Sequence, residues 1–181
     1  MPRTLILGGA RSGKSGRAEA LVAGEPSVRY VATGRRVATD ADWSERIDRH
    51  RDRRPAHWST VEITHHRELA TTLRSGPTTL VDDLGTWLAG ALDDLAAWDS
   101  PRGTVAPAVD ELLAAVTDHP APLVMVTPEV GMSVVPESRA GLLFRDEIGF
   151  LNARLAALCD HVELVVAGRS LVLTDHERSP R

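Results

Sequence analysis

The chain of 181 residues carries 25 acidic and 21 basic side chains, a formal net charge of −4 and 43% hydrophobic residues. These values are ordinary for one globular domain with a full core, and the negative charge gives no reason to expect binding to nucleic acid. The single cysteine, Cys159, excludes an internal disulfide and favours a reducing compartment, and no apolar run approaches the roughly 18 residues that a membrane span needs.

A glycine-rich loop follows the first predicted strand. The segment Gly8-Gly9-Ala10-Arg11-Ser12-Gly13-Lys14-Ser15 matches the phosphate-binding pattern G-x-x-x-x-G-K-[ST], between an apolar run at 4–7 and a helical pattern at 17–22. Its glycines let consecutive N–H groups point at phosphate oxygens, Lys14 would reach the β and γ phosphates, and the Ser15 hydroxyl would hold Mg²⁺. Lys14 is the single lysine in an arginine-rich chain, and a compact ammonium fits between phosphates where a planar guanidinium does not. The loop predicts binding of a nucleoside triphosphate.

A second strand, at 28–32, ends in Thr33-Gly34-Arg35. Ligands of doubly wound sheets bind at the carboxyl ends of the strands. These three residues are therefore expected beside the nucleotide, although a plain turn explains the same residue types.

The next predicted helix covers 41–52 and ends before Pro55. Trp43, Ile47 and His50 repeat at helical spacing on one face, which by itself indicates a partly buried histidine at the edge of a core stripe. Arginines crowd the adjoining positions, where they would attract a polyphosphate.

Four histidines, His50, His57, His65 and His66, lie close together in the sequence and invite the idea of a zinc site. They come from a helix, a loop and a strand-to-helix junction, without ligand spacing or a cysteine pair. Separate surface and pocket histidines are the preferred interpretation.

A strand at 79–83 ends in two carboxylates after an apolar run. This is the Walker B pattern, in which an acid at the end of a strand faces the phosphate loop and helps to hold Mg²⁺. Because neighbouring strand residues point to opposite faces, only one of the pair can face the loop, and we assign that role to Asp82 rather than Asp83.

Strands and helices continue to alternate along the rest of the chain. Further strands are predicted at 58–63, 123–127, 162–167 and 171–173, and further helices at 67–74, 86–97, 108–117 and 139–158. This alternation predicts an α/β fold of the P-loop NTPase (RecA-like) type, a three-layer sandwich with a mostly parallel central sheet and antiparallel edge strands at the C-terminal end.

One segment carries a resemblance to a known family. Residues 46–58, with Glu62 just after them, closely resemble a signature of the bifunctional adenosylcobinamide kinase/adenosylcobinamide-phosphate guanylyltransferases of cobalamin biosynthesis. The Ala-Arg-Ser filling of the P-loop is similar to that family as well. Further similar blocks follow in the same order: Leu80-Val81-Asp82, Glu129-Val130-Gly131, Val135-Pro136-Glu137, and Phe144-Arg145-Asp146 with Gly149 and Asn152.

The resemblance implies two reactions. The first phosphorylates the aminopropanol hydroxyl of adenosylcobinamide with ATP or GTP. The second takes GMP from GTP, releases pyrophosphate, and passes the GMP to adenosylcobinamide phosphate, giving adenosylcobinamide-GDP. The resemblance also implies a homo-oligomer, because members of this family form trimers.

The resemblance also implies site residues. A histidine of the family carries the GMP covalently, and the matching position here is His50, which would be catalytic together with Lys14. Positions matching those that contact the guanine nucleotide are Arg51, Asp52, Arg53, Arg54, Glu62 and Asp82. The chemistry is reasonable by itself, because neutral imidazole is a good nucleophile near its ordinary pKa of about 6.5.

The chain departs from the family pattern at four positions. Pro128 stands where Asn is common, Asp83 where a small or polar residue is common, Leu142 where Arg is expected and Ala153 where Gln is usual. These departures concern the corrinoid side of the pocket and the subunit contacts. They do not touch the P-loop or His50.

Two other functions remain open from the residues alone. One is a different small-molecule P-loop kinase without guanylyl transfer, and the other is a nucleotide-binding regulatory switch that a protein partner reads. The histidine segment argues against both, because neither needs His50. We expect one catalytic domain over 1–174, a frayed tail at 175–181, no signal peptide and a cytoplasmic location.

Overall fold

The computed structural model describes residues 1–35 and 55–173. Its strands are β1 (Arg3–Gly8), β2 (Val28–Ala32), β3 (Ser59–Glu62), β4 (Thr78–Asp82), β5 (Leu123–Pro128), β6 (His161–Val166) and β7 (Arg169–Val172). Its helices are α1 (Lys14–Val22), α3 (His66–Leu73), α4 (Leu84–Asp94), α5 (Ala106–Asp118) and α6 (Arg139–Leu158). The predicted helix at 41–52, and with it His50, lies outside the described residues, as does the tail at 175–181.

The described strands form one sheet in the order β3-β2-β4-β5-β1-β6-β7. Every pairing is parallel except that of β6 with β7, which confirms a mostly parallel sheet with an antiparallel C-terminal edge. β1 lies inside the sheet, with Gly8 level with Pro128 of β5 and Val165 of β6. The P-loop therefore leaves the sheet at its carboxyl edge, the edge at which open α/β sheets bind their ligands.

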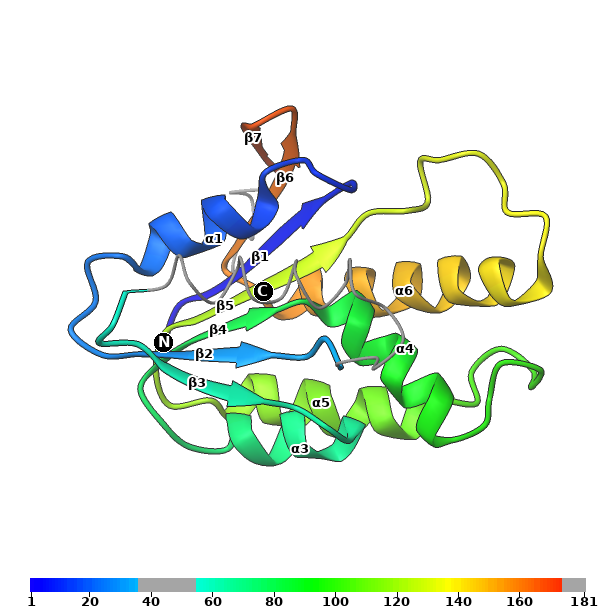
Figure 1. The fold of residues 1–181 in the computed structure, drawn as a ribbon, viewed down its shortest axis with the longest axis horizontal. Coiled ribbons are helices and arrows are strands. Elements are labelled where there is room, and N and C mark those ends of the chain that lie inside the picture. The colour runs from blue at the N-terminus through cyan, green and yellow to red at the C-terminus, as the bar shows by residue number, and fades with distance from the viewer. Residues whose placement is uncertain (36–54, 174–181) are drawn as a thin grey trace, which may run out of the picture.

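The helices lie in two layers on opposite faces of the sheet (Figure 1). α1 covers one face, over a core that includes Ile6, Ala18, Val22, Leu80 and Val126. The other helices cover the second face, over a larger core that includes Leu5, Leu69, Leu88, Leu112 and Leu151. Leu5 and Ile6 are neighbours that belong to different cores, because consecutive strand residues point to opposite faces. The predicted three-layer arrangement is confirmed.

Helix α4 differs from its prediction at both ends. It begins at Leu84 instead of 86, because the side chain of Asp83 caps it by accepting a hydrogen bond from the backbone N–H of Thr86. It ends at Asp94 instead of 97, and Leu95, just beyond the helix, is 40% exposed.

Helix α6 has the predicted bounds, and it buries two polar side chains that the apolar pattern did not indicate. Glu147 accepts a 2.6 Å hydrogen bond from the backbone N–H of Gly103. Asn152 accepts one from the hydroxyl of Thr127 at 2.6 Å and donates one to the carbonyl of Pro128 at 3.0 Å. Helix α6 therefore supports the end of β5 next to the P-loop. Within the described ranges, no helix is both long and apolar enough to cross a membrane.

Candidate active site

The P-loop turns sharply out of β1 and into α1. Gly13 precedes the helix with a φ of 96°, a left-handed value that glycine adopts readily. A Cβ atom on Gly8 would lie 2.7 Å from the carbonyl oxygen of Val165, so this glycine allows the loop to pack against β6. Lys14 is buried, and its Nζ lies 3.4 Å from the carbonyl oxygen of Gly9. Of the remaining loop residues, Ala10 and Arg11 are exposed and Ser12 is buried.

Asp82 meets the P-loop at the end of β4. The hydroxyl of Ser15 donates a 3.2 Å hydrogen bond to Oδ1 of Asp82, and the hydroxyl of Tyr30 donates a 2.6 Å bond to Oδ2. A serine hydroxyl and a carboxylate are hard oxygen donors of the kind that Mg²⁺ prefers. Because these two oxygen donors lie together beside the loop, Ser15 and Asp82 are suitable ligands for Mg²⁺.

Asp83 serves a different element from its neighbour. Its Oδ1 accepts a 2.8 Å hydrogen bond from the backbone N–H of Thr86, and it is the N-cap of α4. Burial raises the pKa of the Asp83 carboxyl, and the adjacent charge of Asp82 raises it further. Thr33 is buried in the turn after β2, and its hydroxyl donates a 2.5 Å bond to the carbonyl of Asp83. The turn after β2 is thus fixed to the start of α4.

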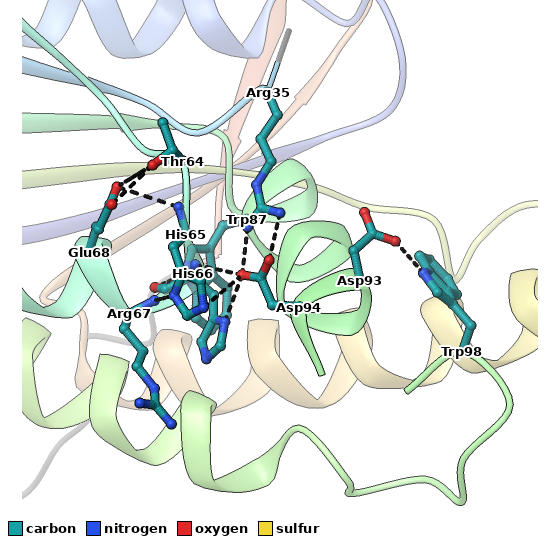
Figure 2. Close-up of polar contacts among 10 residues, drawn as sticks. All are labelled: Arg35, Thr64, His65, His66, Arg67, Glu68, Trp87, Asp93, Asp94 and Trp98. Carbon is teal, nitrogen blue, oxygen red and sulfur yellow. Dashed lines mark hydrogen bonds and ion pairs between the residues drawn. The ribbon is translucent and has the colours of Figure 1, made fainter. Parts of the chain in front are cut away.

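The guanidinium of Arg35 pairs with Asp94 at the far end of α4 (Figure 2), with N–O distances of 2.8 and 2.7 Å. Oδ2 of Asp94 also accepts a 2.9 Å bond from the backbone N–H of His66 and lies 2.8 Å from Nδ1 of its ring. The hydrogen bonds from Arg35, and after them those from His66, hold the pKa of Asp94 well below its ordinary value. Arg35 is therefore engaged by α4, and Gly34 lies between it and the buried Thr33.

His65, His66 and Asp94 offer three ligand atoms within 4.8 Å of one another, an arrangement that also suits a metal ion. Both carboxylate oxygens of Asp94 already face the guanidinium of Arg35, a fixed cation that would repel a metal ion at the same place. The cluster is better explained as a hydrogen-bonded junction of β2, α3 and α4. The rings of His65 and His66 lie 4.4 Å apart between centroids, so the expectation of separate histidines is wrong for this pair.

Comparison with known proteins identifies the family. Residues 4–173 match the family described as cobinamide kinase / cobinamide phosphate guanyltransferase. The bifunctional adenosylcobalamin biosynthesis protein CobU of Salmonella typhimurium is 42% identical over 177 residues, which cover 91% of this chain and 95% of that protein. The CobU protein of Escherichia coli is 38% identical over 174 residues, with coverage of 91% and 95%. The corresponding protein CobP of Pseudomonas aeruginosa is 40% identical over 178 residues, with coverage of 94% and 96%.

This chain belongs to the cobinamide kinase/cobinamide phosphate guanyltransferase family. It is a bifunctional enzyme of adenosylcobalamin biosynthesis, with kinase and guanylyltransferase activities. Both activities need a nucleoside triphosphate, as the P-loop predicted. The resemblance drawn from residues 46–58 and the blocks after them is confirmed.

Other predicted site residues of this cobinamide kinase/guanylyltransferase lie toward the sheet edge. Glu62 is the exposed last residue of β3, and it stands level with Ala32 of β2, which in turn stands level with Asp82 of β4. Glu62 and Asp82 thus end two strands at the same edge, with β2 between them. His50, Arg51, Asp52, Arg53 and Arg54 lie outside the described residues.

The sequence patterns missed three residues that organise the site. The sequence predicts Tyr30 only as part of the strand at 28–32, yet its hydroxyl donates a hydrogen bond to Asp82. Glu163 on β6 is 1% exposed and forms a bidentate pair with Arg17 of α1, with both N–O distances at 2.8 Å. Asn152 belongs to a family-like block, but its support of β5 follows only from the fold. A polar residue inside an apolar stripe was the available signal for both Glu163 and Asn152.

Proposed function

We propose that this enzyme first phosphorylates the aminopropanol hydroxyl of adenosylcobinamide with ATP or GTP. It then transfers GMP from GTP to the new phosphate through a guanylylated histidine, His50, and gives adenosylcobinamide-GDP and pyrophosphate. The observation that carries the proposal is the meeting of Ser15 and Asp82 beside a P-loop whose Lys14 is buried. These groups supply the phosphate and metal contacts on which phosphoryl transfer depends.

In the kinase step, the acceptor hydroxyl oxygen attacks the γ phosphorus, and the nucleoside diphosphate leaves with the electrons of the bridging P–O bond. The hydroxyl proton is released to solvent. The enzyme contributes mainly position and charge, since phosphoryl transfer leaves little covalent chemistry for the protein. Lys14 and the loop amides would hold the β and γ phosphates. Ser15 and Asp82 would hold Mg²⁺, which neutralises the phosphate charge when it is bound.

In the guanylyl step, a ring nitrogen of His50 attacks the α phosphorus of GTP, a P–N bond forms, and pyrophosphate leaves. A phosphate oxygen of adenosylcobinamide phosphate then attacks the same phosphorus, and the imidazole leaves. Covalent catalysis of this kind divides one difficult transfer into two easier ones. The guanine nucleotide would be contacted by Arg51, Asp52, Arg53, Arg54, Glu62 and Asp82, by family resemblance.

We also propose that the enzyme forms a homo-oligomer, a trimer by family resemblance. Large apolar side chains that are exposed in the described chain support an interface: Met132, Val134, Val135, Phe150, Leu171 and Val172. Sedimentation of the purified enzyme tests this, and a monomer at micromolar concentration would contradict it. The supply of nucleoside triphosphates, together with the lone Cys159, favours the cytoplasm as the place of reaction.

The proposed chemistry is tested by incubating the enzyme with GTP and Mg²⁺ without a corrinoid and measuring the intact mass. We expect a gain of one GMP with release of pyrophosphate, and loss of the adduct when adenosylcobinamide phosphate is added. A simple P-loop kinase or a regulatory switch would take up GTP without a covalent adduct. Occupied nucleotide sites without any adduct would therefore exclude the guanylyl step through His50.

A further inference from the structure

The turn between β6 and β7 lies against the P-loop. The backbone N–H of Gly168 donates a 2.8 Å hydrogen bond to the carbonyl oxygen of Ser12, inside the loop. Ala167 and Gly168 form the two-residue turn and have φ values of 49° and 74°, both left-handed, as tight hairpin turns require. Figure 1 shows this hairpin standing at the edge of the sheet near the start of α1. The antiparallel C-terminal hairpin therefore contacts the nucleotide loop directly.

Two further contacts hold the same hairpin against the loop and its helix. Gly13 is close enough to the turn that a Cβ atom would lie 3.5 Å from Cα of Gly168. Glu163 of β6 forms an ion pair with Arg17, which lies near the start of α1. The hairpin thus contacts Gly13, the last glycine of the P-loop, and is paired through Glu163 with the helix that follows the loop.

The hydrogen bond to Ser12 controls the direction of a peptide group. In a trans peptide, the carbonyl and the N–H of the next residue point in opposite directions. A Ser12 carbonyl held by Gly168 therefore points the N–H of Gly13 away from the hairpin. Within a phosphate loop, the N–H groups must face the phosphate oxygens while the carbonyls turn away from them.

We propose that the β6–β7 turn is a positioning element of the nucleotide site. Gly168 fixes the Ser12–Gly13 peptide so that the Gly13 N–H faces the bound phosphates before the nucleotide arrives. The inference rests on the proposed use of the P-loop for ATP or GTP. Gly168 acts through its backbone and touches no substrate, so preorganisation of the loop is its whole contribution.

A single-atom test is available because Cys159, the one cysteine of the chain, precedes the hairpin. A recombinant thioester of residues 1–158 can be ligated to a synthetic peptide of residues 159–181 and refolded, which restores the full chain. In one version of the peptide, an ester oxygen replaces the backbone nitrogen of Gly168 and so removes the N–H. The all-amide ligated chain is the reference.

The matched control is an ester at Leu173. Its backbone N–H donates a hydrogen bond of the same 2.8 Å length, but to Val162 within the hairpin rather than to the P-loop. Both esters should lower the thermal stability of the unliganded enzyme to a similar extent. Only the Gly168 ester should weaken binding of the β,γ-imido analogues of ATP and GTP, by about three- to tenfold, the usual worth of one hydrogen bond.

The outcomes separate the inference from the proposed function. Equal affinities in the two esters would overturn the positioning role. A reference chain that binds neither analogue would instead reject the proposed nucleotide site. Recombinant variants give a second reading: Gly168→Asn keeps the N–H, tolerates a left-handed φ and has open space for its side chain, so it should bind normally. Gly168→Pro removes the N–H and also cannot adopt the φ of 74°, so it disrupts the turn and should weaken binding at least as much as the ester. Normal binding by this variant would also overturn the inference.

Discussion

The hydroxyl of Tyr30 donates a 2.6 Å hydrogen bond to Oδ2 of Asp82. Oδ1 of the same carboxylate faces Ser15 of the P-loop, so the phenol and the loop divide the two oxygens between them. Tyr30 stands on β2 level with Leu80 of β4, which places its ring two residues before the acid at the strand end. Because its ring is buried and held in place, the Tyr30 hydroxyl keeps the Asp82 carboxylate oriented with Oδ1 toward Ser15.

Tyr30→Phe should therefore lower the kinase rate by about fivefold, the effect of losing roughly 1 kcal/mol of hydrogen bonding at the acid. The Mg²⁺ concentration for half-maximal rate should rise, because the carboxylate is no longer held toward Ser15. Initial rates of adenosylcobinamide phosphorylation across a Mg²⁺ series provide the measurement.

The phenylalanine keeps the ring that stacks on Trp58, whose centroid lies 6.4 Å from that of Tyr30. Thermal stability should then change little, and this separates orientation of Asp82 from damage to the core. An unchanged Mg²⁺ requirement would mean that the phenol does not orient the acid.

The adjacent carboxylates should respond differently to the same change. Asp82→Asn should reduce kinase turnover by about a hundredfold or more, since metal binding supplies several kcal/mol of charge stabilisation. Asp83→Asn should leave turnover within about threefold, because Asn is as good an N-cap as Asp. Asp83→Ala should cost about 1 kcal/mol of unfolding free energy through loss of the cap. If Asp83→Asn proves the slower enzyme in steady-state assays, the roles of the two acids are reversed.

Much of the fold follows from local signals. The P-loop lies between an apolar run and a helix, and the glycine at 168 marks the turn that makes the last strands antiparallel. Buried strands such as β5 begin with a continuous apolar run, Leu123 to Val126, so their existence could be predicted without knowing their neighbours. The helix caps were harder to predict, because Asp83 is the last residue of a predicted strand and is also the N-cap of α4.

The polar contacts that shape the site depend on strand order, which local patterns do not contain. Tyr30 meets Asp82 because β2 and β4 are neighbours, and the two residues are 52 positions apart in the chain. Arg35 and Asp94 are 59 positions apart, and their pairing requires the end of α4 to return toward β2. Arg35 was assigned to the nucleotide because it follows a strand, and that pattern carries no information about Asp94.

Asp94→Ala should lower the free energy of unfolding by about 2–3 kcal/mol, since it removes the carboxylate that pairs with Arg35 and that accepts from the His66 ring. Urea unfolding at pH 7 measures this. Glu111→Ala is the matched control, because its contact with Arg74 is an exposed 3.5 Å ion pair that should contribute little. Added Zn²⁺ should not raise the melting temperature, and a rise that Asp94→Ala abolishes would support a metal site instead.

Glu163 should make stability depend on pH in the acid range. The hydrogen bond from Arg17, helped by that from His161, lowers the pKa of Glu163 from 4.5 to about 2. Because the folded pKa lies below the unfolded one, the stabilisation is complete above pH 4.5 and is lost as the pH falls toward 2. Glu163→Gln should thus reduce the unfolding free energy by about 2 kcal/mol at pH 7, and the difference from the native enzyme should shrink below pH 4.5. A difference that is constant across this range would mean that the ion pair is not its source.

His50→Asn should separate the two activities. Without the imidazole, the GMP adduct and all guanylyl transfer should be lost, while phosphorylation of adenosylcobinamide continues through Lys14, Ser15 and Asp82. In the native enzyme the adduct should survive alkali and hydrolyse in mild acid, because protonation makes the ring nitrogen of a phosphoramidate a good leaving group. Its formation should weaken below roughly pH 6, where an ordinary histidine is protonated and has no free lone pair.

His57→Asn is the control for an exposed histidine nearby in the sequence, and it should keep both activities. Retention of the adduct in His50→Asn, shown by intact mass and peptide mapping, would assign the nucleophile to another residue.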